Sequence, residues 1–252
     1  MKNATTALFR RLGKSRSPKA ASFIEVERAE RLFYLKYVHE GMTILDVGAG
    51  IGELTLMFSR FVGATGQVHA FEPSSESFKR LTATCSAASL RNTQLHQRAL
   101  TNEEGTIILH CYGDDYLNWT SQAERPLHRY GINVNSESTE KAPATTLDIF
   151  CKTNSVSSID LLKIDVEGAE FQVLLGARRM LKAQAVKCIA FEFGQTTFDM
   201  GNDPNEIETY LDNLGYLLRN LVSDDPIFPG RESAESACFS MHVASPKSSK
   251  LA

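Results

Sequence analysis

Residues 44–56, with the sequence ILDVGAGIGELTL, constrain the fold more than any other part of the chain. They read as a short apolar strand, a turn with glycines at positions 48, 50 and 52, and the start of a helix. Glycines let a backbone turn tightly and approach a ligand closely. The free N–H groups at the start of the helix attract a negatively charged or polar ligand. The segment therefore predicts a ligand-binding strand–turn–helix unit of an α/β protein.

The alternation of strands and helices continues along the chain. Strands are expected at residues 43–47, 67–71, 93–99, 159–166 and 186–193, with a last strand pair at 216–222 and 237–244. Further helices are expected at residues 23–38, 75–88, 146–152 and 170–181. This order predicts one α/β domain with a Rossmann-like, mostly parallel sheet that carries helices on both faces.

The chain of 252 residues, 42% of them hydrophobic, is long enough for one such domain, which we expect over residues 23–244. Residues 1–22 carry several lysines and arginines and predict a flexible basic N-terminal arm. Residues 245–252 are expected to form a disordered tail. Residues 113–143 are polar and irregular, which indicates an insertion on the substrate side of the domain.

Composition excludes several other classes of protein. A net charge of −3 argues against a general nucleic-acid binder, which is usually basic. No apolar run approaches the roughly 18 residues of a membrane span, so we expect no membrane partner. The five cysteines include no C-x-x-C pair, which favours reduced thiols, a cytoplasmic location and no structural zinc.

Glu72 stands at the end of the second predicted strand, the place of a carboxylate that accepts both hydroxyls of a ribose. A dinucleotide site has the spacing G-x-G-x-x-G after an apolar strand, whereas this turn has G-x-G-x-G and Asp46 precedes it. A carboxylate repels a pyrophosphate but attracts the ammonium group of a methionine moiety. The pattern therefore favours S-adenosylmethionine over NAD as the cofactor.

Four segments together resemble the FkbM family of S-adenosylmethionine-dependent methyltransferases: DVGAGIG at residues 46–52, FEP at 71–73, RAL at 98–100 and IDLLKIDVEGAEFQVLLGA at 159–177. The resemblance implies a class I methyltransferase fold with a seven-stranded sheet and an antiparallel last hairpin. It also implies methyl transfer mostly to hydroxyl oxygens of sugars, polyketides and related metabolites. The chain departs from the family at Gly50, where relatives usually carry asparagine, and at Gly194, where many carry histidine.

The motif residues and the strand ends indicate which side chains and backbone groups contact the cofactor. The predicted cofactor-binding residues are Asp46, Gly48, Ala49, Gly50, Gly52, Glu53, Glu72, Pro73, Arg98, Ala99 and Asp165.

Three carboxylates near the ends of predicted strands are the candidate catalytic residues, because ligands of open α/β sheets bind outside the carboxyl ends of the strands. Asp165 or Glu167 is expected to take a hydroxyl proton, and Glu192 to orient the acceptor. Lys163, on the same strand face as Asp165, is expected to pair with it. These carboxylates could instead hold Mg²⁺, which prefers oxygen ligands. We expect no metal, because the six histidines are scattered.

We therefore expect an O-methyltransferase that uses S-adenosylmethionine and acts on a hydroxyl group of a small molecule. No [DN]-P-P-[YF] turn is present, which argues against methylation of an amino group. We expect no nucleic-acid partner, and a homodimer is left open. The alternatives are an NAD-dependent oxidoreductase, and a nucleoside-binding or macromolecule-modifying protein that uses the basic arm.

Overall fold

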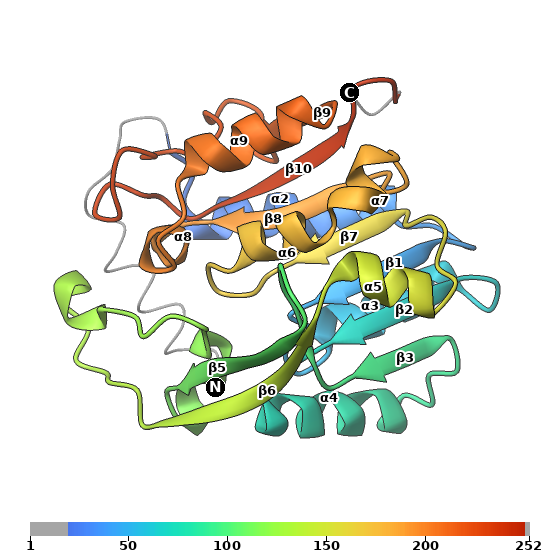
Figure 1. Ribbon diagram of the computed structural model, residues 1–252, viewed down its shortest axis with the longest axis horizontal. Coiled ribbons are helices and arrows are strands. Elements are labelled where there is room, and N and C mark those ends of the chain that lie inside the picture. The colour runs from blue at the N-terminus through green and yellow to red at the C-terminus, as the bar shows by residue number, and fades with distance from the viewer. Residues whose placement is uncertain (1–19, 250–252) are drawn as a thin grey trace.

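The strand before the glycine turn lies at the centre of a seven-stranded sheet in a computed structural model, which describes residues 20–249 (Figure 1). The strands of this sheet are β1 (Thr43–Val47), β2 (Gln67–Phe71), β3 (Thr93–His96), β7 (Leu161–Ile164), β8 (Ile189–Phe193), β9 (Tyr216–Asn220) and β10 (Ser240–Pro246). Their order is β3-β2-β1-β7-β8-β10-β9. Only β10 runs antiparallel to its neighbours, β8 and β9. The predicted fold class, with its antiparallel last hairpin, is confirmed.

Helices cover both faces of this sheet (Figure 1). One face carries α2 (Phe23–Tyr37), α3 (Glu53–Val62) and α4 (Ser75–Ala87), and the other carries α5 (Leu147–Thr153), α6 (Glu170–Gly176), α7 (Arg178–Lys182) and α9 (Pro204–Asn213). Alternate residues of each central strand point to opposite faces. Ile44 of β1 therefore packs with Phe58 of α3, whereas Leu45 packs with the core beneath α6.

Local signals explain where several helices begin. The Ser22 side chain accepts a hydrogen bond from the Glu25 backbone N–H, and the Glu25 carboxylate accepts one from the Ser22 N–H at 2.6 Å, so a capping box starts α2. Asp203 caps α9, and Pro204 occupies its first turn.

A second, smaller sheet was not expected from the sequence. It contains β4 (Ala99–Leu100), β6 (Ser138–Thr145) and β5 (Gly105–Cys111), in that order. The strand predicted at residues 93–99 therefore ends at His96, and part of the predicted irregular stretch 113–143 is strand. β6 has the sequence STEKAPAT, which lacks an alternating apolar pattern, and it is held by its ladder to β5, from Gly105–Ala144 to Cys111–Ser138.

Other boundaries also differ from the predictions. The helix expected at residues 170–181 breaks at Ala177 into α6 and α7, and a short helix, α8 (Gln195–Asp199), follows β8. Residues 245 and 246 belong to β10 rather than to a disordered tail. Residues 1–19 of the predicted arm and 250–252 of the tail lie outside the described residues. Residues 20–22 are packed, since the Ala21 N–H donates to Asp225 Oδ2 at 2.7 Å.

Residues 112–137 connect β5 to β6, and we call them the β5–β6 segment. They contain two short 3₁₀ helices, η1 (Asp114–Trp119) and η2 (Leu127–Tyr130). Their apolar side chains form a small core of their own around Tyr112, Trp119 and Leu127.

None of the helices formed by residues 20–249 has the length and apolar character needed to cross a lipid bilayer.

A buried histidine in β10 predicts how stability depends on pH. His242 is fully buried against the Phe228 ring, at a centroid distance of 4.6 Å, and its Nε2 accepts a hydrogen bond from the Phe228 N–H at 3.3 Å. Burial, helped by Arg231, lowers the pKa of His242 to about 3. Below pH ~6.5 the unfolded chain therefore binds a proton that the folded chain does not, and stability falls as the pH falls.

We expect His242→Gln to remove this acid sensitivity. The quantity to compare is the difference in the free energy of unfolding between the wild type and the variant. As the pH falls from 6.5 to 4.5, this difference should change by about 2–3 kcal/mol in favour of the variant. Urea unfolding at both pH values measures this, with the exposed His39→Gln as the matched control. A difference that does not change with pH would show that His242 does not titrate differently in the folded and unfolded chains.

Candidate active site

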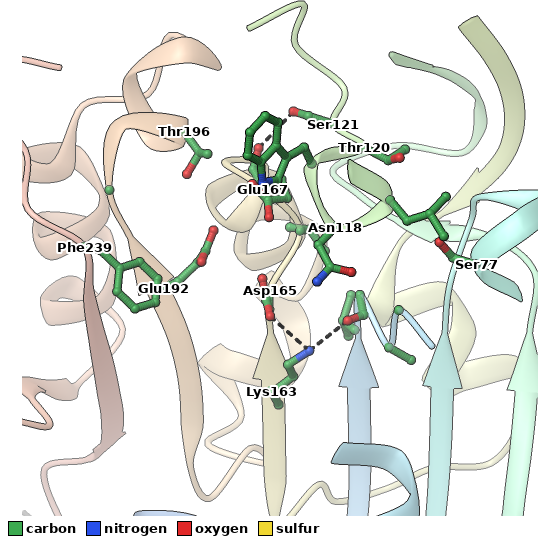
Figure 2. A pocket seen from close by; sticks show the side chains of 18 of the residues that line it. Ser77, Asn118, Thr120, Ser121, Lys163, Asp165, Glu167, Glu192, Thr196 and Phe239 are labelled. Carbon is green, nitrogen blue, oxygen red and sulfur yellow. Dashed lines mark hydrogen bonds and ion pairs between the residues drawn. The ribbon is translucent and has the colours of Figure 1, made fainter. Parts of the chain in front are cut away.

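A cavity of about 740 Å³ lies at the carboxyl ends of β1, β2, β7 and β8. Its walls include the turn after β1, the acids at the ends of the other strands, the start of α2 and part of the β5–β6 segment. Figure 2 shows Asp165, Glu167 and Glu192 around this space, with Asn118 on the opposite side and Lys163 below. The volume falls within the roughly 300–1,000 Å³ of small-molecule sites.

The glycine turn after β1 combines a close backbone approach with an open position. Gly48 has a φ of +76°, and a Cβ atom there would lie 1.7 Å from the Asp165 carbonyl oxygen, so β7 approaches too closely for any side chain. Gly50 lines the cavity with a φ of +54°, and a Cβ there meets nothing within 4 Å. Asparagine also tolerates this left-handed conformation, so the departure from the family at Gly50 leaves the turn intact. The open space at Gly50 leaves room for a ligand.

Gly52 has a packing role at the start of α3. It is the N-cap of α3 with a φ of +91°, and a Cβ there would lie 2.7 Å from Leu81 Cδ1. It does not line the cavity within residues 20–249. Gly52 is therefore needed to pack α3 against α4, and the prediction that it contacts the cofactor stays a prediction.

Glu72 lies directly after β2 and is 7% exposed. Its Oε2 accepts a hydrogen bond from the Gly50 N–H and its Oε1 one from the Ser74 N–H, both at 2.9 Å. These bonds aim the carboxylate along the cavity wall and leave further lone pairs for a ligand. Burial raises the pKa of Glu72 to about 7, although the hydrogen bonds from the two backbone N–H groups act to lower it. The position and the two remaining acceptor sites fit the predicted contact with a ribose diol.

Glu72→Ala is expected to weaken the binding of S-adenosylhomocysteine 10- to 100-fold, because hydrogen bonds to a charged acceptor contribute roughly 1.5–3 kcal/mol each. Isothermal titration measures the affinity. The analogue of S-adenosylhomocysteine that lacks both ribose hydroxyls should bind the wild type and the variant equally, and Glu76→Gln, on the outer side of α4, should leave both affinities unchanged. Equal losses for both ligands would place the defect in the turn rather than at the ribose.

The remaining predicted cofactor residues lie as follows. Ala49, Glu53, Pro73, Arg98 and Ala99 all line the cavity. Ala99 reaches it from β4 of the small sheet, and not from the end of β3 as expected. These predictions concern contacts with a bound molecule and stay predictions.

Asp46 lies near the end of β1, as expected, but neighbouring side chains cover it. It is completely buried, and among residues 20–249 it is not part of the cavity wall. Its Oδ2 accepts from the Thr55 hydroxyl at 2.6 Å, and its Oδ1 lies 3.1 Å from Lys163 Nζ. Asp46 and Lys163 are register partners on adjacent strands, which brings them together. Asp46 therefore holds Lys163, and its expected attraction to the methionine ammonium, directly or through water, stays a prediction.

Lys163 ties this buried pair to the cavity. Its Nζ donates to the Gly48 carbonyl oxygen at 2.8 Å and lies 3.6 Å from Asp165 Oδ2 (Figure 2). The expected pairing with Asp165 is present, but Asp46 lies closer. Asp165, with 42% of its side chain exposed, is the carboxylate that Lys163 presents to the cavity.

The three predicted catalytic carboxylates converge. One oxygen from each of Asp165, Glu167 and Glu192 lies within 4.8 Å of the others, a spacing that could hold a cation. Glu167 lies 3.2 Å from Arg125 Nη1. The Glu192 carboxylate makes no ion pair or hydrogen bond with any other residue in the part of the chain that the structure describes. The expectation that no metal is needed stays a prediction.

Backbone contacts hold Glu167 in an uncommon conformation, with a φ of +55°. Glu170 is buried, and its Oε1 accepts from the N–H groups of Val166 and Gly168, which flank Glu167. The turn is therefore closed by Glu170, and Glu167 is directed toward the cavity.

Burial and mutual repulsion raise the proton affinity of this group. Burial raises the pKa of Glu167 to about 8, with Arg125 opposing the shift. Burial also raises the pKa of Glu192 well above its ordinary value, and the charges of Asp165 and Glu167 add to that shift. A carboxylate with a raised pKa is suited to accept a proton.

Several residues of the cavity wall were not expected from the sequence. Asn118 and Arg125 come from the β5–β6 segment, Phe239 directly precedes β10, and Glu30 lies in the middle of α2. Burial raises the pKa of Glu30 to about 7. No periodicity or motif marks these residues, because only the fold brings them to the sheet edge.

Gly194, the second expected departure from the family pattern, also lines the cavity. Its backbone is extended, and a Cβ there would meet only Phe239 Cα at 3.9 Å. A side chain would therefore fit at this position, and glycine widens the cavity next to Glu192.

The open sheet with an antiparallel last hairpin, the glycine turn at its centre and the acid after β2 define a class I methyltransferase domain. The Methyltransferase FkbM domain matches residues 46–218. The chain therefore belongs to the FkbM family of S-adenosylmethionine-dependent methyltransferases.

A curated relative, Methyltransferase 1 of Beauveria bassiana (strain ARSEF 2860), is 27% identical over 143 residues, which cover 53% of this chain and 57% of that protein. The chain thus spans little more than half the length of this relative. Among solved structures, a SAM-dependent O-methyltransferase from Thermotoga maritima is 14% identical with a TM-score of 0.49, covering 96% of this chain and 72% of that one. Aeropyrum pernix fibrillarin with bound S-adenosyl-L-methionine is 16% identical with a TM-score of 0.46, covering 86% and 73%.

Proposed function

We propose that the protein transfers a methyl group from S-adenosylmethionine to a hydroxyl oxygen of a small-molecule acceptor, with Glu192 as the general base. The supporting observation is that each of the other two carboxylates has a cation beside it. Lys163 lies beside Asp165 and Arg125 beside Glu167, whereas no cation within residues 20–249 contacts Glu192. The ion pairs therefore favour Glu192 as the base, rather than Asp165 or Glu167 as expected from the sequence.

The cavity residues fit the cofactor. Glu72 would accept the ribose hydroxyls, the open position at Gly50 gives the nucleoside space, and Asp165 offers a carboxylate to the cationic methionine portion. When bound, S-adenosylmethionine would supply a methyl group on a positively charged sulfur. The acceptor oxygen would bond to this methyl group as the sulfur leaves in S-adenosylhomocysteine. Holding the two reactants in line can contribute roughly 7–11 kcal/mol.

Glu192 takes the proton of the acceptor hydroxyl in this proposal. A positioned general base contributes about 10²–10⁴-fold, less than positioning does. Glu167, fixed by Arg125, and the Asn118 amide in the β5–β6 segment line the same space and would orient the acceptor. After transfer, the proton on Glu192 returns to solvent.

A small acceptor is supported by the walls of the cavity, to which the β5–β6 segment and the start of α2 both contribute. Within a volume of about 740 Å³, a nucleoside cofactor leaves space for a compact molecule. Family membership removes the NAD-dependent oxidoreductase from consideration. Modification of a macromolecule through the basic arm stays the second candidate.

Methyl-¹³C-labelled S-adenosylmethionine and a panel of hydroxylated metabolites test the proposal. We expect a new O-methyl carbon signal in the product, and we expect transfer to survive deletion of residues 1–19. Residues 20–22 must be kept because they line the cavity. Products methylated only on nitrogen or carbon, or transfer that requires a macromolecule and residues 1–19, would contradict it.

A further inference from the structure

One buried arginine of the β5–β6 segment contacts two acids in other parts of the site. The Arg125 side chain is 7% exposed, and its Nη1 lies 3.2 Å from Glu167 Oε2. Its Nε lies 3.5 Å from Oδ2 of Asp199, the last residue of α8, whose side chain is 3% exposed. One guanidinium therefore links three parts of the chain that are far apart in sequence.

Three further hydrogen bonds support this arrangement. The Arg125 backbone N–H donates to the Tyr112 hydroxyl at 2.8 Å, and the Tyr130 hydroxyl donates to Asp199 Oδ1 at 2.6 Å. The Ser121 hydroxyl donates to the Glu167 carbonyl oxygen at 2.9 Å. Tyr112 and Tyr130 belong to the small core of the β5–β6 segment, so these contacts join that core to α8 and to the turn after β7.

The charges around Glu167 make Arg125 more than a packing residue. Most of the charged groups around the Glu167 carboxylate are acids. Asp165 lies in the turn after β7, Glu170 is the first residue of α6, and Glu192 lies in β8. Arg125 is the one cation within 4.0 Å of Glu167 in the described chain. A cation at this distance favours the ionised form of the carboxylate, and its planar guanidinium also fixes direction.

The titratable and charged groups that act on Glu167, Glu192 and Asp199 include these three acids themselves and five other residues. Asp165 and Glu170 flank Glu167 in the chain after β7. The others, Arg125, Arg129 and Tyr130, belong to the β5–β6 segment.

We propose that Arg125 is a positioning residue that holds the β5–β6 segment against the cavity and favours the ionised form of Glu167 beside Glu192. It acts through Glu167 and Asp199 and does not itself touch the reacting atoms. Its role as an aid to base catalysis rests on the proposed function, whereas its two structural consequences do not. The position of the β5–β6 segment is thereby coupled to the charge of the catalytic carboxylates.

The experiment compares Arg125→Met and Arg125→Lys with Arg129→Met, a matched control at an exposed arginine of the same segment. Carbon NMR of protein with ¹³C-labelled glutamate follows the titration of Glu167 and Glu192 without any acceptor. We expect Arg125→Met to raise the titration midpoint of Glu167 by about one pH unit or more, because a close cation lowers a carboxyl pKa by roughly 1–3 units. Arg125→Lys should restore most of this shift, and Arg129→Met should match the wild type.

Hydrogen exchange gives the second readout. Amides of residues 113–137 should exchange about 10- to 100-fold faster in Arg125→Met, the loss expected for charge-assisted hydrogen bonds. Asp199→Asn keeps the Arg125–Glu167 pair, so it should speed exchange without moving the Glu167 midpoint, and it serves if Arg125→Met does not fold. An unchanged Glu167 midpoint in Arg125→Met, or the same effects in Arg129→Met, would overturn the proposal. Because no acceptor is used, failure of the proposed methyl transfer would not produce these outcomes.

Discussion

Lys163→Met is expected to lower the free energy of unfolding by about 3–5 kcal/mol, the usual cost of removing one partner of a buried ion pair. Lys163 is 2% exposed and Asp46 is 0% exposed, so the Asp46 carboxylate would stay in the core without its cation. Burial alone would lower the pKa of Lys163, but Asp46, Asp165 and Glu30 together raise it above its ordinary value, so the wild-type side chain is charged at neutral pH. Guanidinium unfolding followed by circular dichroism measures the loss.

A second variant isolates the unpaired charge as the cause. Combining Lys163→Met with Asp46→Asn removes both charges, so the double variant should recover a large part of the loss. Lys187→Met, at an exposed lysine before β8, is the matched control and should stay close to the wild type. A double variant as unstable as Lys163→Met would show that packing, and not the orphaned carboxylate, sets the cost.

Glu192→Gln is expected to reduce kcat by about 10²–10⁴-fold, equivalent to roughly 3–5 kcal/mol of activation free energy. The amide keeps the shape of the side chain but cannot take a proton. The affinity for S-adenosylhomocysteine should not change, because the predicted ribose contact is Glu72. A base must be deprotonated to act, and the pKa of Glu192 is raised, so wild-type kcat should fall as the pH falls through that raised value. The variant should lack this acidic limb.

Glu206→Gln, at an exposed acid in the first turn of α9, is the control for Glu192→Gln and should keep wild-type turnover. A chelator provides a further arm, because Asp165, Glu167 and Glu192 are close enough for a shared cation. Activity that disappears with the chelator and returns with Mg²⁺ would make Glu192 a metal ligand and contradict its assignment as the base. Equal losses of kcat in Glu192→Gln and Glu206→Gln would contradict it as well.

The sequence was most informative about the site where a residue type and a local pattern coincide. The position of Glu72 on the cavity wall could be predicted from its place directly after the second strand. The convergence of Asp165 with Glu192 could be predicted because the carboxyl ends of parallel strands share one edge of the sheet. The burial of Asp46 was not expected, because position along a strand does not tell which neighbouring side chain will cover it. The register of β1 with β7 sets Lys163 opposite Asp46 and closes it off from the cavity.

By itself, the sequence determined the strand–turn–helix unit and the strand succession of the main sheet, because period-two and helical patterns and glycine turns are local properties of the chain. The family was indicated by the resemblance of four motif segments to its members. Only the tertiary structure decided that β6 is a strand, that Gly52 packs on Leu81 and that Arg125 reaches Glu167. The physical reason is the same in each case. These contacts join residues far apart in the sequence, and their partners are chosen by strand pairing, close packing and charge, which leave no periodic trace along the chain.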